Sequence, residues 1–357
     1  MIPKPDKVHN TFKLNEISYN HSELIDVACN LIKDGKPFEK KIGNFLADWL
    51  DDSDYIESNT SGSTGRPKTI QIQKQAMVNS AIATANCFNL KPSDKAFNCL
   101  PIESIAGKMM LVRAMIIGLE LDIVNPLKFP DFDIYKSYDF CAMIPLQLYN
   151  SLKHVNNIKA IIVGGAPVSI HLLKRIQNIE ATVYETFGMT ETVSHIAVRQ
   201  LNHLQDGEQS NVFKLLPNII ISQDDRGCLV INAQRLNSET IVTNDVINII
   251  SESEFEWLGR YDNVINSGGV KLYPETIEAK LQSQISQRFL IASNEDNELG
   301  EKLILIIEGK KRMISSSIFD CLDKFEKPKE IVYIPQFAET SSGKVHRKNT
   351  LKFLNQL

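Results

Sequence analysis

A strand, a turn, a helix and a second strand follow one another in the middle of this sequence, and this pattern restricts the fold more than any other feature. Residues 159–163 form an apolar run of strand length, and residues 164–167 (GGAP) predict a turn. Apolar residues then recur at helical spacing over residues 169–177, before a new strand over residues 182–185. Strands joined through a helical crossover pair in parallel, so the pattern predicts a βαβ unit within α/β layers.

Shorter elements after about residue 260 predict a separate, small α+β domain. We expect a helix starting at Pro274, a strand over 302–309, a helix over about 318–325 and a strand over 330–335. The polar turn at residues 259–262 is the predicted boundary.

Composition narrows the class of partner and the compartment. The 357 residues carry a net charge of −4, so no basic field would attract nucleic acid or an anionic membrane. The six cysteines form no C-x-x-C pair, which argues against a disulfide framework and a zinc site. The sequence shows no signal-peptide apolar segment at its start and no run of about 18 apolar residues, so we expect a cytoplasmic protein without a membrane span.

Residues 58–70 (SNTSGSTGRPKTI) are rich in glycine and hydroxyl side chains. Backbone N–H groups and hydroxyls in such a loop suit phosphate oxygens, although a flexible surface loop would have a similar composition. The spacing does not satisfy a Walker A loop. We expect no strand before this loop, and an alternating strand, residues 69–73, after it.

The string over residues 60–68 resembles the phosphate-binding signature of the adenylate-forming superfamily, which includes acyl-CoA synthetases, luciferases and peptide-synthetase adenylation domains. Four further segments agree in order, so the resemblance covers about residues 58–350. It implies a large N-terminal αβαβα-type domain of stacked sheets and helices and a small C-terminal α+β domain. The residues that it assigns to ATP phosphates are Thr60, Ser61, Gly62, Ser63, Thr64, Gly65 and Lys68.

Two central segments extend the resemblance. Gly164, Gly165, Ala166 and Pro167 are similar to the family's adenine-contacting turn, although such a string is also an ordinary strand-to-helix turn. Residues 184–191 (YETFGMTE) resemble the central signature.

In that central signature, the resemblance implies that Thr190 contacts phosphate and that Glu191 holds Mg²⁺, which needs a carboxylate of this kind. By itself Glu191 would be a solvated surface acid. Thr186, Phe187 and Gly188 are the other nucleotide-binding residues expected here.

The resemblance places the ribose at Asp245, with Arg260 as a complementary donor. The family usually has glycine where this chain has Asn244. Asparagine tolerates a positive φ, so we expect Asn244 to preserve the turn.

The reaction implied by the resemblance has two halves: a carboxylate and Mg-ATP give an acyl-adenylate and pyrophosphate, and a thiol then displaces AMP. Lys344 resembles the lysine that bridges the carboxylate and the α-phosphate. Its neighbours Arg347 and Lys348 are expected to form a solvated basic run.

The thiol half needs another surface. Ser267, Gly268 and Gly269 resemble the loop lining the pantetheine tunnel, although two glycines also suit a plain hairpin turn. One domain cannot present both this loop and Lys344 at once, so a hinge is expected at Asp262. The predicted domains are therefore residues 1–259 and 263–357, joined by the hinge 260–262.

The acid is indicated by residues 100–108 followed by Arg113, which look most like the o-succinylbenzoate-CoA ligases of menaquinone synthesis. Lys108 or Arg113 is expected to attract the second carboxylate of a dicarboxylic aromatic acid, and each could equally be a helix-surface cation. Ser104 and Ser194 are the other expected acid-binding residues. His195 belongs either to the acyl pocket or to the structural core.

The expected substrates are ATP with Mg²⁺, coenzyme A and a small carboxylic acid. Another acyl- or aryl-acid ligase, an enzyme loading a carrier-protein thiol, and a catalytically silent nucleotide-binding regulator are the alternatives. Because the phosphate loop begins near residue 60, we also expect that much of the family's preceding subdomain is missing, which would affect the acyl pocket and a homodimer surface.

Overall fold

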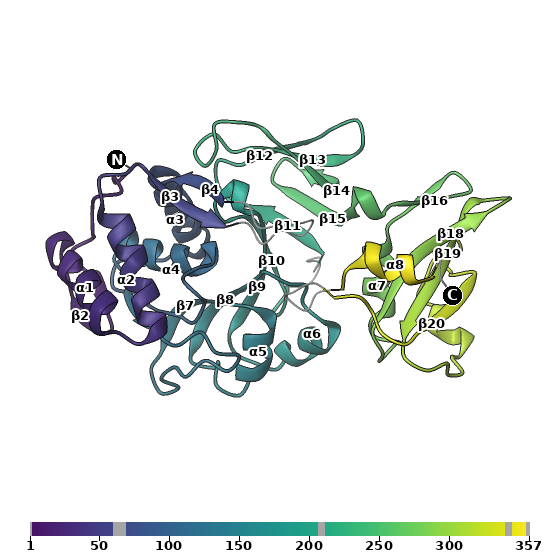
Figure 1. Cartoon of the computed structure of the whole chain (residues 1–357), viewed down its shortest axis with the longest axis horizontal. Coiled ribbons are helices and arrows are strands. Elements are labelled where there is room, and N and C mark those ends of the chain that lie inside the picture. Colours follow the sequence, from purple (N-terminus) through teal and green to yellow (C-terminus); the bar gives the residue numbers. More distant parts are fainter. Residues whose placement is uncertain (1, 60–68, 206–210, 340–344, 355–357) are drawn as a thin grey trace. The chain divides into compact units, whose positions relative to one another are not determined.

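The computed structural model describes residues 2–59, 69–205, 211–339 and 345–354 (Figure 1). The chain divides into two compact units. Unit 1 comprises Met1–Ser222, Val230–Ile241 and Ile249–Phe255, and unit 2 comprises Gln223–Leu229, Val242–Asn248 and Glu256–Leu357. A large α/β unit and a small α+β unit confirm the predicted fold class. The hinge at 260–262 stays a prediction.

The predicted βαβ unit is present in unit 1. β8 (Ile158–Val163) and β9 (Thr182–Gly188) pair in parallel, with α6 (Ile170–Ile176) between them in sequence. The Ser169 hydroxyl begins α6 by accepting a hydrogen bond from the Leu172 N–H group at 3.2 Å. Parallel pairing through a helical crossover was therefore predictable from the periodicity alone.

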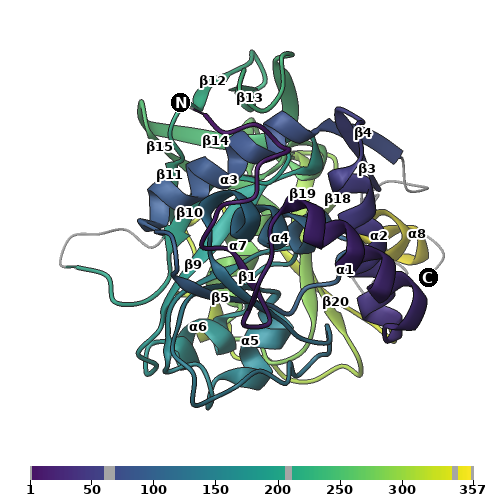
Figure 2. The same ribbon diagram turned by 90° about the vertical axis from the view of Figure 1, so that its left-hand side faces the viewer.

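Helices cover both faces of the central sheet of unit 1. Alternate strand residues point to opposite sides: Phe140 and Ala142 of β7 (Tyr138–Met143) pack with α3 (Lys74–Phe88) and α4 (Ile105–Ile117), whereas Cys141 and Met143 pack with α5 (Pro145–Ser151) and α6. Figures 1 and 2 show α3 beside α4, and α1 beside α2. The strand order through this part of the sheet is β11-β10-β9-β8-β7-β5-β6-β1-β2.

The remaining elements of unit 1 are short strands and two N-terminal helices. β12 to β15 have residues in both units. Their bounds are β1 Lys13–Leu14, β2 Ile17–Ser18, α1 His21–Asp34, α2 Pro37–Leu50, β3 Tyr55–Asn59, β4 Thr69–Gln73, β5 Lys95–Asn98, β6 Glu120–Ile123, β10 His195–Gln200, β11 Val212–Leu215, β12 Ile220–Gln223, β13 Cys228–Asn232, β14 Ile241–Ser251 and β15 Glu254–Arg260.

The expectation that no strand precedes residues 60–68 is wrong. β3 lies directly before that segment and pairs antiparallel with β4, with Ile56 opposite Ile72. Ile56 and Ser58 are buried, so the strand alternates, but a buried serine hides the period-2 pattern in the sequence. The prediction of a strand over residues 69–73 is confirmed, and α3 follows it directly.

Unit 2 is built on β18 (Phe289–Asp296) and β19 (Gly300–Glu308), which pair antiparallel. One face packs with α7 (Pro274–Leu281), and the other packs with α8 (Arg347–Leu354) through Leu351. β16 (Ile265–Ser267) and β20 (Glu330–Ile334) flank β19, and β17 (Val270–Leu272) pairs with β16. The predicted helix at Pro274 and the two predicted strands are confirmed.

The helix predicted over 318–325 is wrong, because only a 3₁₀ turn, η3 (Ser316–Phe319), forms there. The Asp323 N–H group donates to the Glu326 carboxylate at 3.1 Å, so a side chain replaces the helical carbonyl partner. Leu322 is buried without a regular helix.

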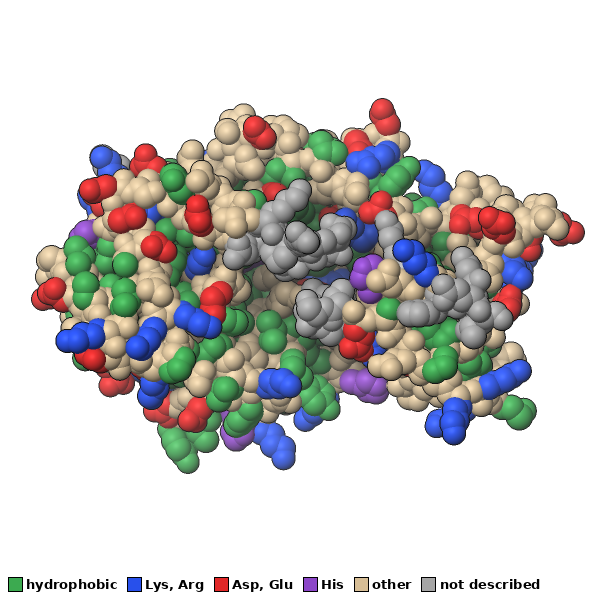
Figure 3. Space-filling view, viewed as in Figure 1, with side chains coloured by type: hydrophobic (Ala, Val, Ile, Leu, Met, Phe, Trp, Pro, Cys, Tyr) green, Lys and Arg blue, Asp and Glu red, His purple; other side chains and the backbone are tan. Residues whose placement is uncertain are grey.

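Charged side chains of both signs are interspersed over the face shown in Figure 3. This distribution agrees with the small net charge of −4. Among the described residues, no helix has the length and apolar composition needed to cross a bilayer.

The expectation that Arg347 belongs to a solvated basic run is wrong. Its Nη2 donates to both oxygens of Glu278 at 2.7 and 2.9 Å, and its Nη1 donates to the Ile291 carbonyl. The two charged side chains are 21% and 22% exposed. The Nη2 contacts connect the start of α8 to α7, 69 residues away in sequence, and the Nη1 contact connects it to β18, 56 residues away.

Replacing Arg347 with methionine should lower the free energy of unfolding by about 3 kcal/mol, because Glu278 would lose its charged partner in a mostly buried position. Thermal and denaturant unfolding of the full chain measure this. Lys302→Met, which removes the Lys302–Glu330 pair of the same unit, should lower stability much less, because both side chains of that pair are more exposed. Equal losses in the two variants would contradict the role given to Arg347.

Candidate active site

The structure places only part of the predicted site. The expected phosphate loop, Thr60 to Lys68, and the expected bridging lysine, Lys344, lie outside the described residues, so their roles stay predictions. The remaining predicted residues fall into one group in unit 1 and one group in unit 2.

The predicted adenine turn lies against the central signature in unit 1. A Cβ atom at Gly164 would collide with the Thr186 hydroxyl, which donates a 3.1 Å hydrogen bond to the Val163 carbonyl. Gly165 has a φ of 80°, and residues 165–167 are exposed. The structure therefore brings Gly164 and Thr186 together and leaves the rest of the turn accessible to a ligand.

The connection from β9 to β10 is held by one buried hydroxyl. Thr192 Oγ1 accepts from the Met189 N–H group at 3.1 Å and lies 2.8 Å from the Ser194 carbonyl oxygen. Gly188 packs so closely on Ser194 that a side chain would not fit. Val193 has a φ of 66°, an unfavourable conformation for a β-branched residue that the surrounding contacts maintain.

Thr190 and Glu191 project from this fixed turn, η1 (Thr190–Thr192). Glu191 is exposed, and among the described residues its carboxylate has no hydrogen-bond or ion-pair partner. No cluster of three metal-ligating side chains occurs in the described part of the chain. Mg²⁺ commonly binds through one or two carboxylates together with substrate phosphates, so a single accessible glutamate fits that ion.

Phe187 belongs to an aromatic cluster that the sequence did not indicate. Its ring centroid lies 5.7 Å from that of Phe213 and 5.3 Å from that of Phe255. The three rings come from β9, β11 and β15, so pairing of these strands is needed to assemble them. Phe187 thereby supports the signature strand from within the fold.

In unit 2 the structure brings Asp245 and Arg260 together. Arg260 Nη1 lies 3.3 Å from Asp245 Oδ2, and the Trp257 indole N–H donates to Asp245 Oδ1 at 3.0 Å. The carboxylate is 9% exposed. Trp257 was not predicted, although it stands close to Arg260 in sequence and is one of only two tryptophans in the chain.

The expectation of a turn at Asn244 is wrong, because this residue lies within β14 and has no positive φ. Its side chain accepts a 2.9 Å hydrogen bond from Arg226 Nη1 and donates to the predicted hinge residue Asp262 at 3.4 Å. The Asn244 side chain, which a glycine would lack, therefore adds contacts within the extended strand β14. The hinge role of Asp262 stays a prediction.

Ser267, Gly268 and Gly269 lie at the β16–β17 hairpin. Gly268 and Gly269 have φ values of 59° and 82°, as a tight two-residue hairpin requires. The turn alone explains the two glycines, and their contact with a pantetheine arm stays a prediction.

Arg113 is buried inside unit 1, so its interpretation as a helix-surface cation is wrong. Its side chain is 2% exposed and burial lowers its pKa to about 9. Nη2 donates to Ser194 Oγ at 2.9 Å, and Nε has no partner among the described residues. Nη1 donates to Met110 Sδ at 3.7 Å, and no described acidic side chain pairs with this guanidinium.

Ser104 and Lys108 have structural partners. The Ser104 hydroxyl caps α4 by accepting from the Gly107 N–H group at 3.2 Å. Lys108 Nζ donates to the Glu57 carbonyl at 2.7 Å, and desolvation lowers its pKa although Asp48 and Glu103 oppose that effect. Because acids already face Lys108, Arg113 is the better candidate for a substrate carboxylate.

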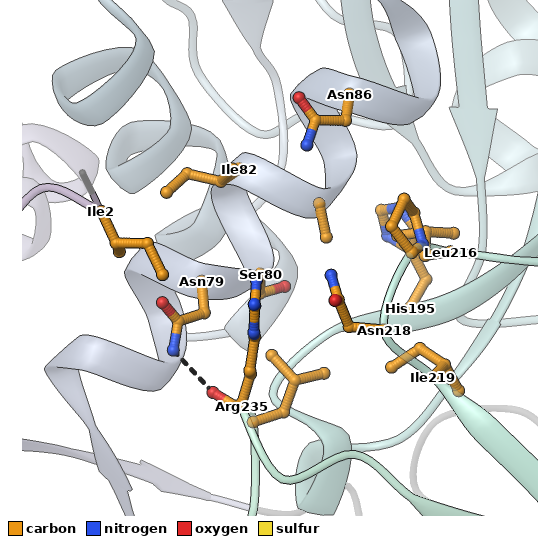
Figure 4. A pocket seen from close by; sticks show the side chains of 13 residues that line it. Ile2, Asn79, Ser80, Ile82, Asn86, His195, Leu216, Asn218, Ile219 and Arg235 are labelled. Atoms are coloured by element: carbon orange, nitrogen blue, oxygen red, sulfur yellow. Dashed lines mark hydrogen bonds between the residues drawn. The ribbon is translucent and has the colours of Figure 1, made fainter.

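Ser194 and His195 connect Arg113 to a cavity of about 50 Å³ in unit 1. Ser194 Oγ lies 3.2 Å from His195 Nδ1, and His195 forms part of the cavity wall opposite α3 (Figure 4). Ser80 also lines the cavity, and its buried hydroxyl has no partner in the described part of the chain. Arg235 lies at another side of the cavity, where its carbonyl accepts from Asn79 at 2.7 Å.

Comparison with known proteins shows the family of this chain. The model of the AMP-binding enzyme family matches residues 58–230. The crystal structure of an acyl-CoA synthetase (AMP-forming)/AMP-acid ligase II-like protein from Dyadobacter fermentans is 34% identical, covers 92% of this chain and 98% of that chain, and has a TM-score of 0.62. The chain belongs to the AMP-binding enzyme family.

More distant relatives have names that specify the acid. A 2-succinylbenzoate–CoA ligase of Lactococcus lactis is 23% identical over 85% of this chain and 72% of its own length, and that of Haemophilus influenzae is 25% identical over 83% and 70%. A Bacillus subtilis o-succinylbenzoate coenzyme A synthetase, solved with ATP and magnesium, shares the fold at 21% identity and a TM-score of 0.68, over 83% of this chain and 69% of that one. The prediction of an adenylate-forming ligase is confirmed at the level of the family.

Replacing Arg113 with methionine should raise the free energy of unfolding of the unliganded protein by about 1 to 4 kcal/mol, because the change removes a buried charge that has no acidic partner among the described residues. Thermal unfolding without substrates measures this. Arg199→Met, which breaks a 2.7 Å contact with Glu185 in the same unit, should lower stability instead. A comparable loss in both variants would contradict the account of Arg113.

Burial and then Arg113 lower the pKa of His195 well below its usual value of 6.5, so the unfolded chain takes up a proton that the folded chain does not. Stability should therefore fall as the pH drops below 6.5, by about 1 kcal/mol at pH 5.5. The melting temperature of His195→Gln should depend less on pH over this range than that of the wild type. Parallel curves for the two proteins would show that His195 is protonated normally in the fold.

Proposed function

We propose that this chain is an ATP-dependent acid–CoA ligase of the o-succinylbenzoate type. A substrate carboxylate oxygen attacks the α-phosphate of ATP and pyrophosphate leaves. The thiol of coenzyme A then attacks the acyl carbon of the acyl-adenylate, loses its proton, and AMP leaves. The net products are an acyl-CoA thioester, AMP and pyrophosphate.

The burial of Arg113 with no acidic partner in the described part of the chain carries this proposal. o-Succinylbenzoate has two carboxylates, one to be activated and one to be bound. A guanidinium forms strong paired hydrogen bonds with a carboxylate, and the bond gains strength where water is excluded. A monocarboxylic acid would leave the buried charge unpaired. The names of the relatives favour the same acid.

The other roles are those that the family resemblance implies. Glu191 would hold Mg²⁺, which supplies positive charge to the triphosphate, and Thr190 would contact phosphate. Asp245 and Arg260 would bind the ribose. Lys344 would bridge the carboxylate and the α-phosphate.

The thiol half remains part of the proposal. The hairpin over residues 267–269 would contact the pantetheine arm of coenzyme A, after rotation at Asp262. A homodimer and a cytoplasmic location also stay predictions.

Pyrophosphate release measured with o-succinylbenzoate, benzoate and a fatty acid tests the proposal. The diacid should give the highest kcat/KM, and Arg113→Met should raise its KM at least about 30-fold because one side of a buried charge pair is lost. Lys108→Met, as the matched variant on the same helix, should change this KM little, since Lys108 contacts a carbonyl.

Three results would contradict the proposal. A preference for benzoate or the fatty acid would indicate another acyl- or aryl-acid ligase. ATP binding without release for any acid would indicate a regulator. Acyl transfer to a carrier-protein thiol, with none to coenzyme A, would indicate a loading enzyme.

A further inference from the structure

A continuous chain of polar contacts runs from Arg113 on α4 to the backbone of α3. Arg113 Nη2 lies 2.9 Å from Ser194 Oγ, which lies 3.2 Å from His195 Nδ1. On the other side of the ring, His195 Nε2 lies 3.5 Å from Thr84 Oγ1, which donates at 3.0 Å to the Ser80 carbonyl. All five residues belong to unit 1.

The two ends of this chain determine the direction of every hydrogen bond in it. A guanidinium can only donate, and a carbonyl can only accept. Ser194 therefore accepts from Arg113 and has its own hydrogen available for His195 Nδ1. Thr84 gives its hydrogen to the Ser80 carbonyl, so it accepts from His195 Nε2–H. Only a neutral imidazole with its hydrogen on Nε2 satisfies both hydroxyls.

We propose that His195 is a positioning residue for acid recognition: through Ser194 it fixes the direction in which the Arg113 guanidinium is held. This inference rests on the proposed function, in which Arg113 binds the second carboxylate. Ser194 occupies Nη2 and Met110 Sδ accepts from Nη1 at 3.7 Å, while Nε has no partner in the described structure. His195 itself touches neither the acid nor the reacting atoms.

The surroundings of His195 keep the ring in this form. The ring is buried beside Arg113 of α4, and Arg235, a second cation in the described part of the chain, lines the same cavity. Both effects favour the neutral ring. A protonated ring would donate from Nδ1, leave Ser194 with two donors and place a second positive charge beside Arg113.

The tautomer can be measured without any activity. Nitrogen-15 chemical shifts of His195 should show a hydrogen on Nε2 and none on Nδ1, unchanged between about pH 8 and pH 6. Ser194→Ala should shift the Nδ1 signal by removing its donor, whereas the signals of His154, a half-buried histidine of the same unit, should not move. A hydrogen on Nδ1, or titration of the ring near pH 6.5, would overturn the proposed direction of these hydrogen bonds.

Kinetics test the positioning role. His195→Phe, which keeps a planar ring but loses the acceptor, should raise the KM for o-succinylbenzoate about 2- to 10-fold and leave the KM for ATP unchanged. His195→Gln, which retains an acceptor oxygen, should restore most of the affinity, and His154→Gln should change neither constant. In an Arg113→Met background, His195→Phe should have no further effect on the KM for the diacid.

The opposite results separate the two proposals. An equal effect of His195→Phe with and without Arg113 would mean that the ring contributes only to packing, which overturns the positioning role. If the wild type releases no pyrophosphate with any acid, the proposed function fails and the positioning role fails with it. The nitrogen-15 measurement of the His195 tautomer would still show whether the hydrogen bonds from Arg113 to the Ser80 carbonyl exist.

Discussion

Parallel pairing of β8 with β9 is the constraint on which the unit 1 site depends. This pairing sets the ends of the two strands beside each other. Gly164 therefore lies so close to Thr186 that a side chain at position 164 would not fit. In parallel α/β sheets the carboxyl ends of the strands are where ligands bind. The position of Thr190 and Glu191 follows, because η1 directly continues β9 and Thr192 fixes its return into β10.

Burial of a charge inside this scaffold links stability to function. Arg113 lies in a buried stretch of α4, where Met109, Val112 and Ala114 are also fully buried. The apolar packing of α3 and α4 on the sheet offsets the cost of desolvating the guanidinium. Under the proposed function, an anionic ligand supplies the acidic partner that the described residues lack. Burying the guanidinium without that partner costs stability in the unliganded protein.

Much of this could be predicted from the sequence. Periodicity indicated the βαβ unit and, in unit 2, α7, β19 and β20, and the order of the motifs indicated the family. Local patterns failed where a side chain replaced a regular backbone partner, as at Asp323 and Glu326, or where a polar residue such as Ser58 was buried. They also gave no sign of Trp257 as a donor to Asp245, since that contact requires β14 and β15 to lie together.

The sequence by itself determined the class of chemistry, because the family's motifs are short, local strings whose residue types carry their function. Tertiary structure alone decided which of two cations is buried without an acidic partner among the described residues. Lys108 and Arg113 lie on the same helix and read alike, yet one reaches the Glu57 carbonyl and the other is enclosed beside Ser194. Arg347 likewise reads as a surface residue but is paired with Glu278. Burial and pairing depend on residues far apart in sequence, and only packing brings them together.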